Sequence, residues 1–378
     1  MSAGVIAVSA ILMGQAGRPP APAKASWCSS GGLLSSPNRG TFDSLHGIAA
    51  INMQDVWAVG NYIDSRGDTR ILAEHWDGKR WKLVDAPDPD ADDSLDAVTA
   101  FSSTDAWAVG GSSDGAAYNA HTLVERWNGS SWNVAPSPGS GYLNGLASLS
   151  RTDIWAVGGR ILGSNPVETL VEHWDGSKWQ TVPSPDPGAY GNSLASVSVT
   201  GPSSVWAVGT DHNSAFGSES LVEHWDGAKW SVVHVPEIGL DSNLRSIASA
   251  GKDDVWAVGS YEQESPSGTL SLTLTERWNG SRWAIVTSPS PTGDDSLSGV
   301  AAVSSSDAWA VGSSAGNPAL IMQWRDQAWR LLASPYRRHS LNLLFSVSAP
   351  SAADVWAAGL YIELHDYSYH TLTEEVCA

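Results

Sequence analysis

The chain has 378 residues, with 21 Lys and Arg against 40 Asp and Glu, which gives a formal net charge of −19. So acidic a chain repels phosphate, and its longest basic run is Arg337-Arg338-His339, so the composition argues against nucleic-acid binding. Hydrophobic residues make up 42% of the sequence, enough at this length to bury a large core, which argues against disorder. The aromatic content is unusual, because 20 Trp outnumber 9 Tyr and 4 Phe.

Residues 1–25 are predicted to be a signal peptide. Residues 4–13 form an apolar run that suits the core of a signal peptide and is too short for a membrane-spanning helix. Ala23-Lys24-Ala25 matches a cleavage pattern that would place Ser26 first. The positive segment that normally opens a signal peptide is missing, because no Lys or Arg precedes Arg18. We therefore expect a secreted or extracellular protein; the alternative is a disordered tail rich in Ala and Pro.

A block of the form Asp-x-Trp-Ala-Val-Gly recurs seven times at intervals of 47 to 53 residues. The copies begin at Asp55, Asp105, Asp153, Ser204, Asp254, Asp307 and Asp354. A second block, Glu-His/Arg-Trp-Asp/Asn-Gly-x-x-Trp, follows the first five copies, and a degenerate version spans residues 323–329. A period near 50 residues, built from short β-rich runs between Pro, Gly and Ser, is typical of one four-stranded β-propeller blade per copy.

Each repeat divides into four strands, A to D in chain order. In the second repeat they are predicted at 95–101, 106–110, 122–127 and 132–135, with the Asn-Gly pair between C and D as a hairpin signal. The predicted fold is all-β: a seven-bladed β-propeller of four-stranded antiparallel blades over residues 26–378. The blades are predicted at about 43–88, 94–137, 143–184, 193–236, 243–288, 296–334, and 341–378 plus 26–34.

The seventh repeat reaches Val376 without a strand D, whereas Trp27 stands alone before the first repeat. We expect the N-terminal segment to supply this strand and close the ring, with Trp27 as the strand-D tryptophan. The 20 Trp then divide into seven in strand B, six in strand C and seven in strand D. Cys28 and Cys377 would meet at this seam as a disulfide, for which chain entropy predicts a stabilisation of about 5 kcal/mol. The alternative is two unrelated thiols.

The two blocks resemble the repeats of bacterial secreted Trp-rich β-propellers. The Asp-Gly-x-x-Trp hairpin also resembles the Asp-box of sialidases, with one residue fewer between Asp and Gly. The blade length is similar to that of kelch and galactose-oxidase propellers, although the Gly-Gly and Tyr signatures of kelch blades are absent. The resemblance covers residues 26–378. It implies the fold but no single activity, because propellers serve as binding modules, hydrolases, lyases and oxidases.

Residues that recur in nearly every repeat are predicted to be structural. The strand-B tryptophans are Trp57, Trp107, Trp155, Trp206, Trp256, Trp309 and Trp356, and the strand-C glutamates are Glu74, Glu125, Glu172, Glu223 and Glu276. We expect the tryptophans to pack between blades, the alternative being stacking on sugar rings. The glutamates are expected to bind indole N–H or backbone groups, since an active site needs one asymmetric constellation. The Asp that begins strand B is expected to cap a turn.

The B-to-C and D-to-A loops share one face of a propeller and vary in length here, so we expect function there. All nine Tyr map to these loops, and Tyr suits recognition because its ring is apolar and its tip polar. The alternative is that exposed loops simply contain Tyr. The predicted ligand-binding residues are Tyr62, Tyr118, Tyr142, Tyr190, Tyr261, Tyr336, Arg337, Arg338, Tyr361, His365, Asp366, Tyr367 and Tyr369.

The preferred interpretation is a monomeric, non-catalytic binding propeller that recognises a glycan, cell-wall polymer or protein. One alternative is a glycoside hydrolase or polysaccharide lyase, which would need two carboxylates about 5 to 9 Å apart. Its candidate carboxylates are Asp64, Asp211, Glu262, Glu363 and Asp366. The other alternative is a structural surface protein. We expect no cofactor; Asp88, Asp90 and Asp92 crowd one loop as calcium ligands do, but without a complete metal-loop spacing.

Overall fold

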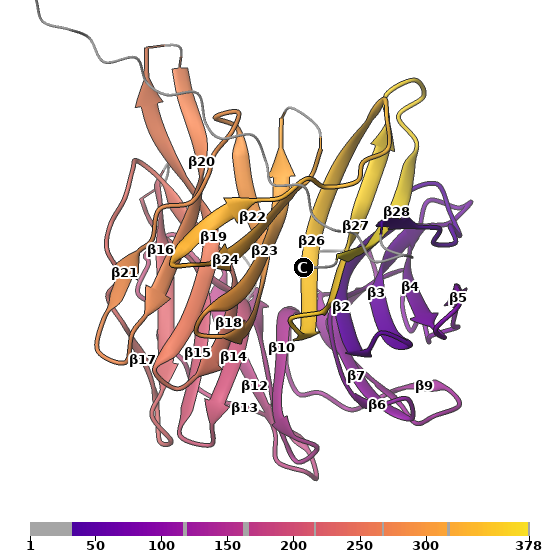
Figure 1. Ribbon diagram of the computed structural model, residues 1–378. Coiled ribbons are helices and arrows are strands. Elements are labelled where there is room, and N and C mark those ends of the chain that lie inside the picture. Colours follow the sequence, from indigo (N-terminus) through magenta and orange to yellow (C-terminus); the bar gives the residue numbers. More distant parts are fainter. Residues whose placement is uncertain are drawn as a thin grey trace, which may run out of the picture.

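The computed structural model describes residues 32–115, 119–161, 166–214, 217–266, 268–315 and 318–376. These ranges form seven four-stranded antiparallel sheets that stand around one axis as the blades of a propeller (Figure 1). The predicted seven-bladed, all-β fold is therefore confirmed. Within the same ranges, no helix is long and apolar enough to cross a membrane.

The first four blades follow one another along the chain in the order A, B, C, D. Blade 1 contains β2 (Ser44–Asn52), β3 (Asp55–Ile63), β4 (Thr69–Trp76) and β5 (Trp81–Leu83). Blade 2 contains β6 (Asp92–Ser102), β7 (Asp105–Ser113), β8 (His121–Trp127) and β9 (Trp132–Val134). Blade 3 contains β10 (Tyr142–Ser150), β11 (Asp153–Arg160), β12 (Glu168–Trp174) and β13 (Trp179–Thr181). Blade 4 contains β14 (Asn192–Gly201), β15 (Ser204–Ser214), β16 (Gly217–Trp225) and β17 (Trp230–Val232).

The last three blades continue this order until the ring closes. Blade 5 contains β18 (Ser242–Gly251), β19 (Asp254–Ser265), β20 (Gly268–Trp278) and β21 (Trp283–Ile285). Blade 6 contains β22 (Asp295–Ser304), β23 (Asp307–Ser314), β24 (Leu320–Arg325) and β25 (Ala328–Leu331). Blade 7 contains β26 (Ser340–Ser351), β27 (Asp354–Glu363), β28 (Tyr369–Val376) and, from the other end of the chain, β1 (Gly32–Leu34).

The ring closes as predicted, because β1 is the outermost strand of blade 7 and pairs antiparallel with β28. The predicted place of Trp27 as the strand-D tryptophan stays a prediction, because this residue lies outside the described ranges. Leu33 lies opposite Glu374, as Leu83 lies opposite Glu74 in blade 1. Trp81 stands two residues before Leu83, and the sequence two residues before Leu33 is glycine. The described part of strand D in blade 7 is Gly32–Leu34.

The strand-B tryptophans join the blades. Trp57 of blade 1 packs on the strand-C and strand-D tryptophans of blade 2, with ring centroids 5.0 Å from Trp127 and 5.1 Å from Trp132. Equivalent groups of three indoles link all neighbouring blades except blades 6 and 7. There Trp309 lies in a cluster with Val376 and Leu33 instead. Blades 6 and 7 thus pack together through aliphatic side chains around Trp309, whereas the other neighbouring blades pack through three indoles.

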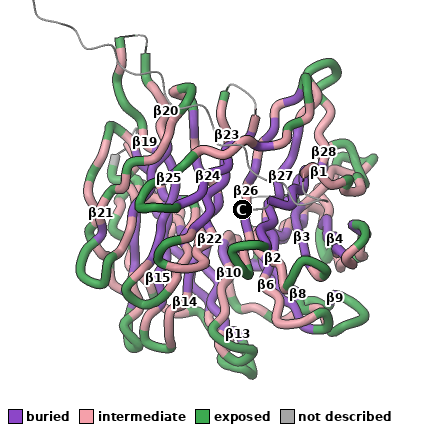
Figure 2. Tube along the Cα trace, in the orientation of Figure 1, coloured by how far each residue is buried: buried purple, intermediate pink, exposed green. Residues whose placement is uncertain are grey.

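Strand alternation explains why these joints fit. Trp57 and Val59 share a cluster with Ala106 and Ala108 of blade 2, whereas the opposite face of β3 presents Ala58 to the preceding blade. A large face of each strand B therefore packs on a small face of the next. In Figure 2 the buried residues follow the strands, and the exposed residues gather at the connecting loops.

The C-to-D links use Asp-Gly and Asn-Gly differently from a two-residue hairpin. Trp76 pairs with Trp81, so four residues lie between the strands. Gly78 adopts a φ of +84°, while Asp77 accepts hydrogen bonds from the backbone N–H of Lys79 and of Arg80, both at 3.0 Å. Glycine thus supplies the left-handed conformation, and Asp or Asn caps the link.

Candidate functional site

The strand-B aspartates hold the strand-C His or Arg in place, which goes beyond the predicted role as turn caps. Asp55 lies 2.7 Å from Nε2 of His75, and Asp254 lies 2.7 Å from Nε of Arg277. The His75 ring stacks on Trp57 with centroids 4.3 Å apart. The His and Arg of the Glu-His/Arg-Trp blocks therefore belong to the scaffold.

The strand-C glutamates are fully buried, and of the predicted partners the described residues show a backbone group, the N–H of Gly139 at Glu172, but no indole N–H. Glu74 accepts a hydrogen bond from the Ser36 hydroxyl at 2.5 Å, and Glu172 accepts one from the Ser137 hydroxyl at 2.6 Å. The donors are hydroxyls of the preceding blade. The strand-C indoles point elsewhere, since Nε1 of Trp76 donates to a backbone carbonyl in the A-to-B turn.

Three glutamates, Glu125, Glu223 and Glu276, have no hydrogen-bond donor on either oxygen within the described residues. The hydroxyl that Ser36 and Ser137 supply is replaced by Ala86 before Glu125 and by Val235 before Glu276, whereas the equivalent Ser184 before Glu223 bonds to Thr169 instead. Burial raises the pKa of all three carboxyls to about 8, with nearby Asp carboxylates adding to the effect at Glu125 and Glu223. These groups are therefore mostly protonated at neutral pH.

The predicted tyrosines do not form one patch. Three are strongly exposed: Tyr367 at 72%, Tyr190 at 59% and Tyr336 at 47%. Tyr62, Tyr142, Tyr261 and Tyr369 are half-buried, and Tyr361 is buried. Tyr118 lies outside the described residues, as do Cys28 and Cys377.

Blade 7 brings the densest set of predicted residues together. We call residues 336–339 and 361–370 the seam sector. The guanidinium of Arg337 lies 4.5 Å from the ring centroid of Tyr361, and the Tyr361 ring stacks on His370 at 4.9 Å. Tyr369 stacks on Phe42 with centroids 4.1 Å apart, which ties the sector to the connection from β1 to β2. These rings form the base of the sector.

The tip of the β27–β28 hairpin carries the exposed groups of the seam sector. His365, Asp366 and Tyr367 are exposed, and Tyr367 adopts a φ of +58°. The turn is held by the backbone N–H of Tyr367, which donates to the Glu363 carbonyl at 2.8 Å. The backbone N–H of Leu364 donates to the carbonyl of His339 at 2.9 Å, which joins the two halves of the sector. The phenol ring is thus presented to solvent by a hydrogen-bonded turn.

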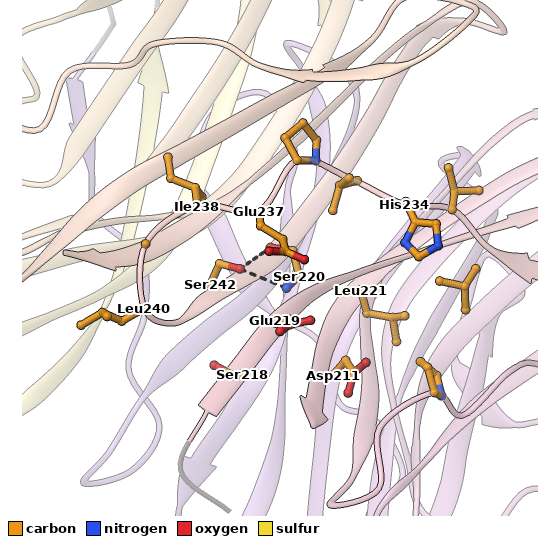
Figure 3. A pocket seen from close by; sticks show the side chains of 16 residues that line it. Asp211, Ser218, Glu219, Ser220, Leu221, His234, Glu237, Ile238, Leu240 and Ser242 are labelled. Carbon is orange, nitrogen blue, oxygen red and sulfur yellow. Dashed lines mark hydrogen bonds between the residues drawn. The ribbon is translucent and has the colours of Figure 1, made fainter. Parts of the chain in front are cut away.

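Blade 4 contains a pocket that the sequence analysis did not predict (Figure 3). The cavity measures about 210 Å³ and lies between the start of β16 and the D-to-A loop at 232–242. Asp211, Glu219, His234 and Glu237 line it. One signal was available: this loop reads Val-His-Val-Pro-Glu, where blades 2, 3 and 5 carry Ser-Pro.

The two carboxylates of this pocket lie on neighbouring strands. Asp211 pairs directly with Glu219 in the β15–β16 ladder, which puts both side chains on one face of the sheet. Oδ1 of Asp211 is buried without a hydrogen-bond partner among the described residues. Burial, and next the charge of Glu219, raise the pKa of Asp211 above its ordinary value. The pair thus places two carboxyl groups side by side in the wall of the pocket.

Three of the other predicted carboxylates bond to neighbouring protein groups, and the fourth is exposed. Asp64 lies 3.4 Å from Nε of Arg70, and Asp366 accepts from the hydroxyl of Ser368 at 2.7 Å. Glu363 accepts from a serine hydroxyl, and Glu262 is exposed on β19.

The acidic loop of blade 1 is built as a cap for the adjacent strand. Asp88 accepts from the backbone N–H of Ile71 at 2.8 Å, and Asp92 from that of Thr69 at 3.1 Å. Asp90 accepts from a serine hydroxyl at 2.9 Å. Across the described ranges, no three or more His, Cys, Asp or Glu side chains are grouped so that they could hold a metal ion.

Comparisons with known proteins give structural likeness only. No family model matches the chain, and no curated protein matches it in sequence. A structure of YCF48 bound to a D1 peptide has a TM-score of 0.54 at 13% identity, covering 91% of this chain and 98% of that chain. YCF48 from Cyanidioschyzon merolae has a TM-score of 0.51 at 14% identity, with the same coverage.

Raptor from Chaetomium thermophilum has a TM-score of 0.53 at 10% identity, covering 92% of this chain and 28% of that chain. At these identities the likeness shows the fold alone. The chain is thus a seven-bladed β-propeller, similar in fold to YCF48 and to part of Raptor.

Proposed function

We propose that the chain is an exported, monomeric and non-catalytic propeller that binds a protein partner through the seam sector. The carrying observation is the exposed tip, where Tyr367 and Tyr336 accompany the exposed side chains of Arg338, His339 and His365. Exposed Tyr and Arg are the side chains that contribute most to protein interfaces.

The charge of the sector suggests the chemistry of the partner. The chain carries a net charge of −19, and residues 337–339 are its longest basic run. An acidic partner segment would be repelled elsewhere and attracted here. The similar YCF48 structure contains a bound D1 peptide, so a propeller of this general shape can hold a peptide. We therefore favour an acidic, partly apolar peptide segment over a glycan.

A peptide selection tests this proposal. Phage-displayed peptides would be selected on the wild-type chain and measured again on Y336A/Y367A by fluorescence polarisation. We expect acidic peptides that bind the double variant at least 10-fold more weakly. Y190A is the matched control, since Tyr190 is exposed on another blade and its loss should change nothing. Peptides that bind all three proteins equally would refute the assignment. Binding of polysaccharides that is lost in Y336A/Y367A would replace the protein partner by a glycan.

The pocket of blade 4 favours a second candidate, hydrolysis of a glycoside. Directly opposed residues of an antiparallel pair have Cβ atoms about 5 Å apart, close to the separation of carboxylates in retaining glycosidases. Asp211 would act as the acid and Glu219 as the nucleophile. Mass spectrometry of oligosaccharides incubated with the wild type, D211N and the control D64N tests this. Products from the wild type and D64N alone would support hydrolysis, whereas no product from the wild type would exclude it for that panel.

A further inference from the structure

The seven A strands share a three-residue sequence pattern. Each contains a Leu that is 0% exposed, then a variable residue, then Gly, Ala or Ser. The variable residues are His46, Asp96, Asn144, Ala195, Arg245, Ser298 and Phe345. Seven repeats that agree on either side of this position therefore differ in size and charge at the position itself.

The structure places a β-bulge at this residue in all seven blades. In blade 1, Leu45 pairs with Gly60 and Gly47 pairs with Val59, which leaves His46 without a ladder partner. The same shift occurs in the other blades. The Gly that ends each Asp-x-Trp-Ala-Val-Gly block permits it, because a Cβ at Gly60 would lie 1.9 Å from the Ser44 carbonyl oxygen. A bulge redirects its side chain.

These bulged residues line a cavity of about 240 Å³ enclosed by the A strands of all seven blades. A liquid water molecule occupies about 30 Å³, so the cavity has room for more than one polar molecule. A ligand on the axis would meet a different side chain from each blade. The channel is thus the place where a symmetric scaffold offers an asymmetric set of contacts.

Most polar side chains of the channel already have partners. Nδ1 of His46 lies 2.8 Å from Asp96, and the ring of Phe345 lies edge-on to His46 at 6.1 Å. The amide of Asn144 donates to the backbone carbonyl of Leu194 at 2.9 Å. The carboxyl of Asp96 therefore already has a hydrogen-bond partner on blade 1.

Arg245 is the charged channel residue that lacks an oppositely charged partner among the described residues. Its Nε donates to Oδ1 of Asn243 at 3.2 Å, and no carboxylate of the described residues lies within 4.0 Å of its guanidinium. The flanking blades contribute small residues, Ala195 and Ser298, so space remains beside it. Surrounding protein lowers the pKa of Arg245 from its ordinary value, although its side chain keeps exposed surface in the channel. In the part of the chain that the structure describes, no protein acceptor lies within hydrogen-bond reach of the other N–H donors of the guanidinium.

We propose that the central channel binds a small oxyanion, a phosphate or a carboxylate, at the guanidinium of Arg245. The planar fork of Arg matches both groups, and the hydroxyl of Ser298 on the adjacent blade is a second donor. The site is independent of the seam sector, because none of the channel residues belongs to it.

Isothermal titration calorimetry tests the proposal with the full chain and three probes: inorganic phosphate, acetate and citrate. We expect saturable 1:1 binding of at least one probe, and the strongest probe identifies the anion class. R245Q should bind that probe about 10- to 100-fold more weakly, as expected for charge-assisted hydrogen bonds. R282Q is the matched control, since Arg282 is exposed on the C-to-D link of the same blade. It makes the same charge change and should bind like the wild type.

A second variant guards against misfolding of R245Q. A195D places a carboxylate beside Arg245 and should weaken binding by a similar factor while the guanidinium remains. Unfolding midpoints near that of the wild type would show that both variants fold. The proposal is overturned if no probe binds the folded wild type, or if R245Q or A195D binds as tightly as the wild type. Equal weakening by R282Q would also overturn it, because the effect would then be general charge.

Discussion

Single residues show how burial controls ionisation in this propeller. Glu276 is fully buried without a hydrogen-bond donor, and its pKa is raised to about 8. Its ordinary value, 4.5, applies in the unfolded chain. Below pH 4.5 both states hold the proton. Between pH 4.5 and 8 the unfolded chain releases it while the folded chain keeps it, so stability falls as pH rises. Blade 6 avoids this cost, because Gln323 stands at the equivalent place.

We therefore predict that E276Q stabilises the protein at pH 8 by on the order of 1 kcal/mol or more, and changes little at pH 5. Guanidinium unfolding midpoints at the two pH values measure this. E262Q, an exposed position on the same blade, should have no effect at either pH. Equal changes at pH 5 and pH 8 for E276Q would mean that the carboxyl does not titrate differently on folding.

At the scale of elements, the seam is the joint built differently from the other six. Six joints contain three indoles, whereas Trp309 at the seam packs with Val376 and Leu33. β1 contributes three residues and belongs to the opposite end of the chain from its partner. Leu33 therefore contributes to ring closure, while Leu83 at the same register position in blade 1 is 39% exposed.

We predict that L33D destabilises the protein by on the order of 2 kcal/mol, because it places a carboxylate in an apolar cluster and next to Glu374. L83D should cost less than about 0.5 kcal/mol, as is usual at exposed positions. Denaturant unfolding of both variants checks this. Similar losses in the two variants would show that the seam is no more sensitive than an ordinary blade edge.

For the whole molecule, the two ends of the chain meet in one blade. The outermost β1–β28 pair, Gly32 with Glu375, is four residues from Cys28 and two from Cys377, both of which lie outside the described residues. A disulfide between them would close almost the whole chain into one loop, for which the chain-entropy model gives about 5 kcal/mol before strain.

We predict that a reducing agent lowers the unfolding midpoint of the protein purified under oxidising conditions. C28S/C377S should show the lower midpoint without reductant and should not respond to it. Non-reducing peptide mapping would identify the bond directly. Insensitivity of the wild type to reductant, with two free thiols by mass spectrometry, would leave the seam to β1 alone.

The sequence by itself determined the blade number, the four-stranded unit and the shared final blade. Seven copies of one block with alternating large and small residues indicate this packing, because the large face of one copy can pack on the small face of the next. The sequence also indicated the seam sector, since its Tyr, Arg and His depart from the repeat.

Only the tertiary structure decided the rest. Glu74 and Glu172 accept hydrogen bonds from hydroxyls 38 and 35 residues earlier in the chain, and the register of β1 depends on pairing with β28. The pocket between β16 and its loop and the position of Arg245 on the axis also required the assembled ring. Local pattern specifies which face of a strand is buried. Which residues of different blades meet is set by how seven blades close around one axis.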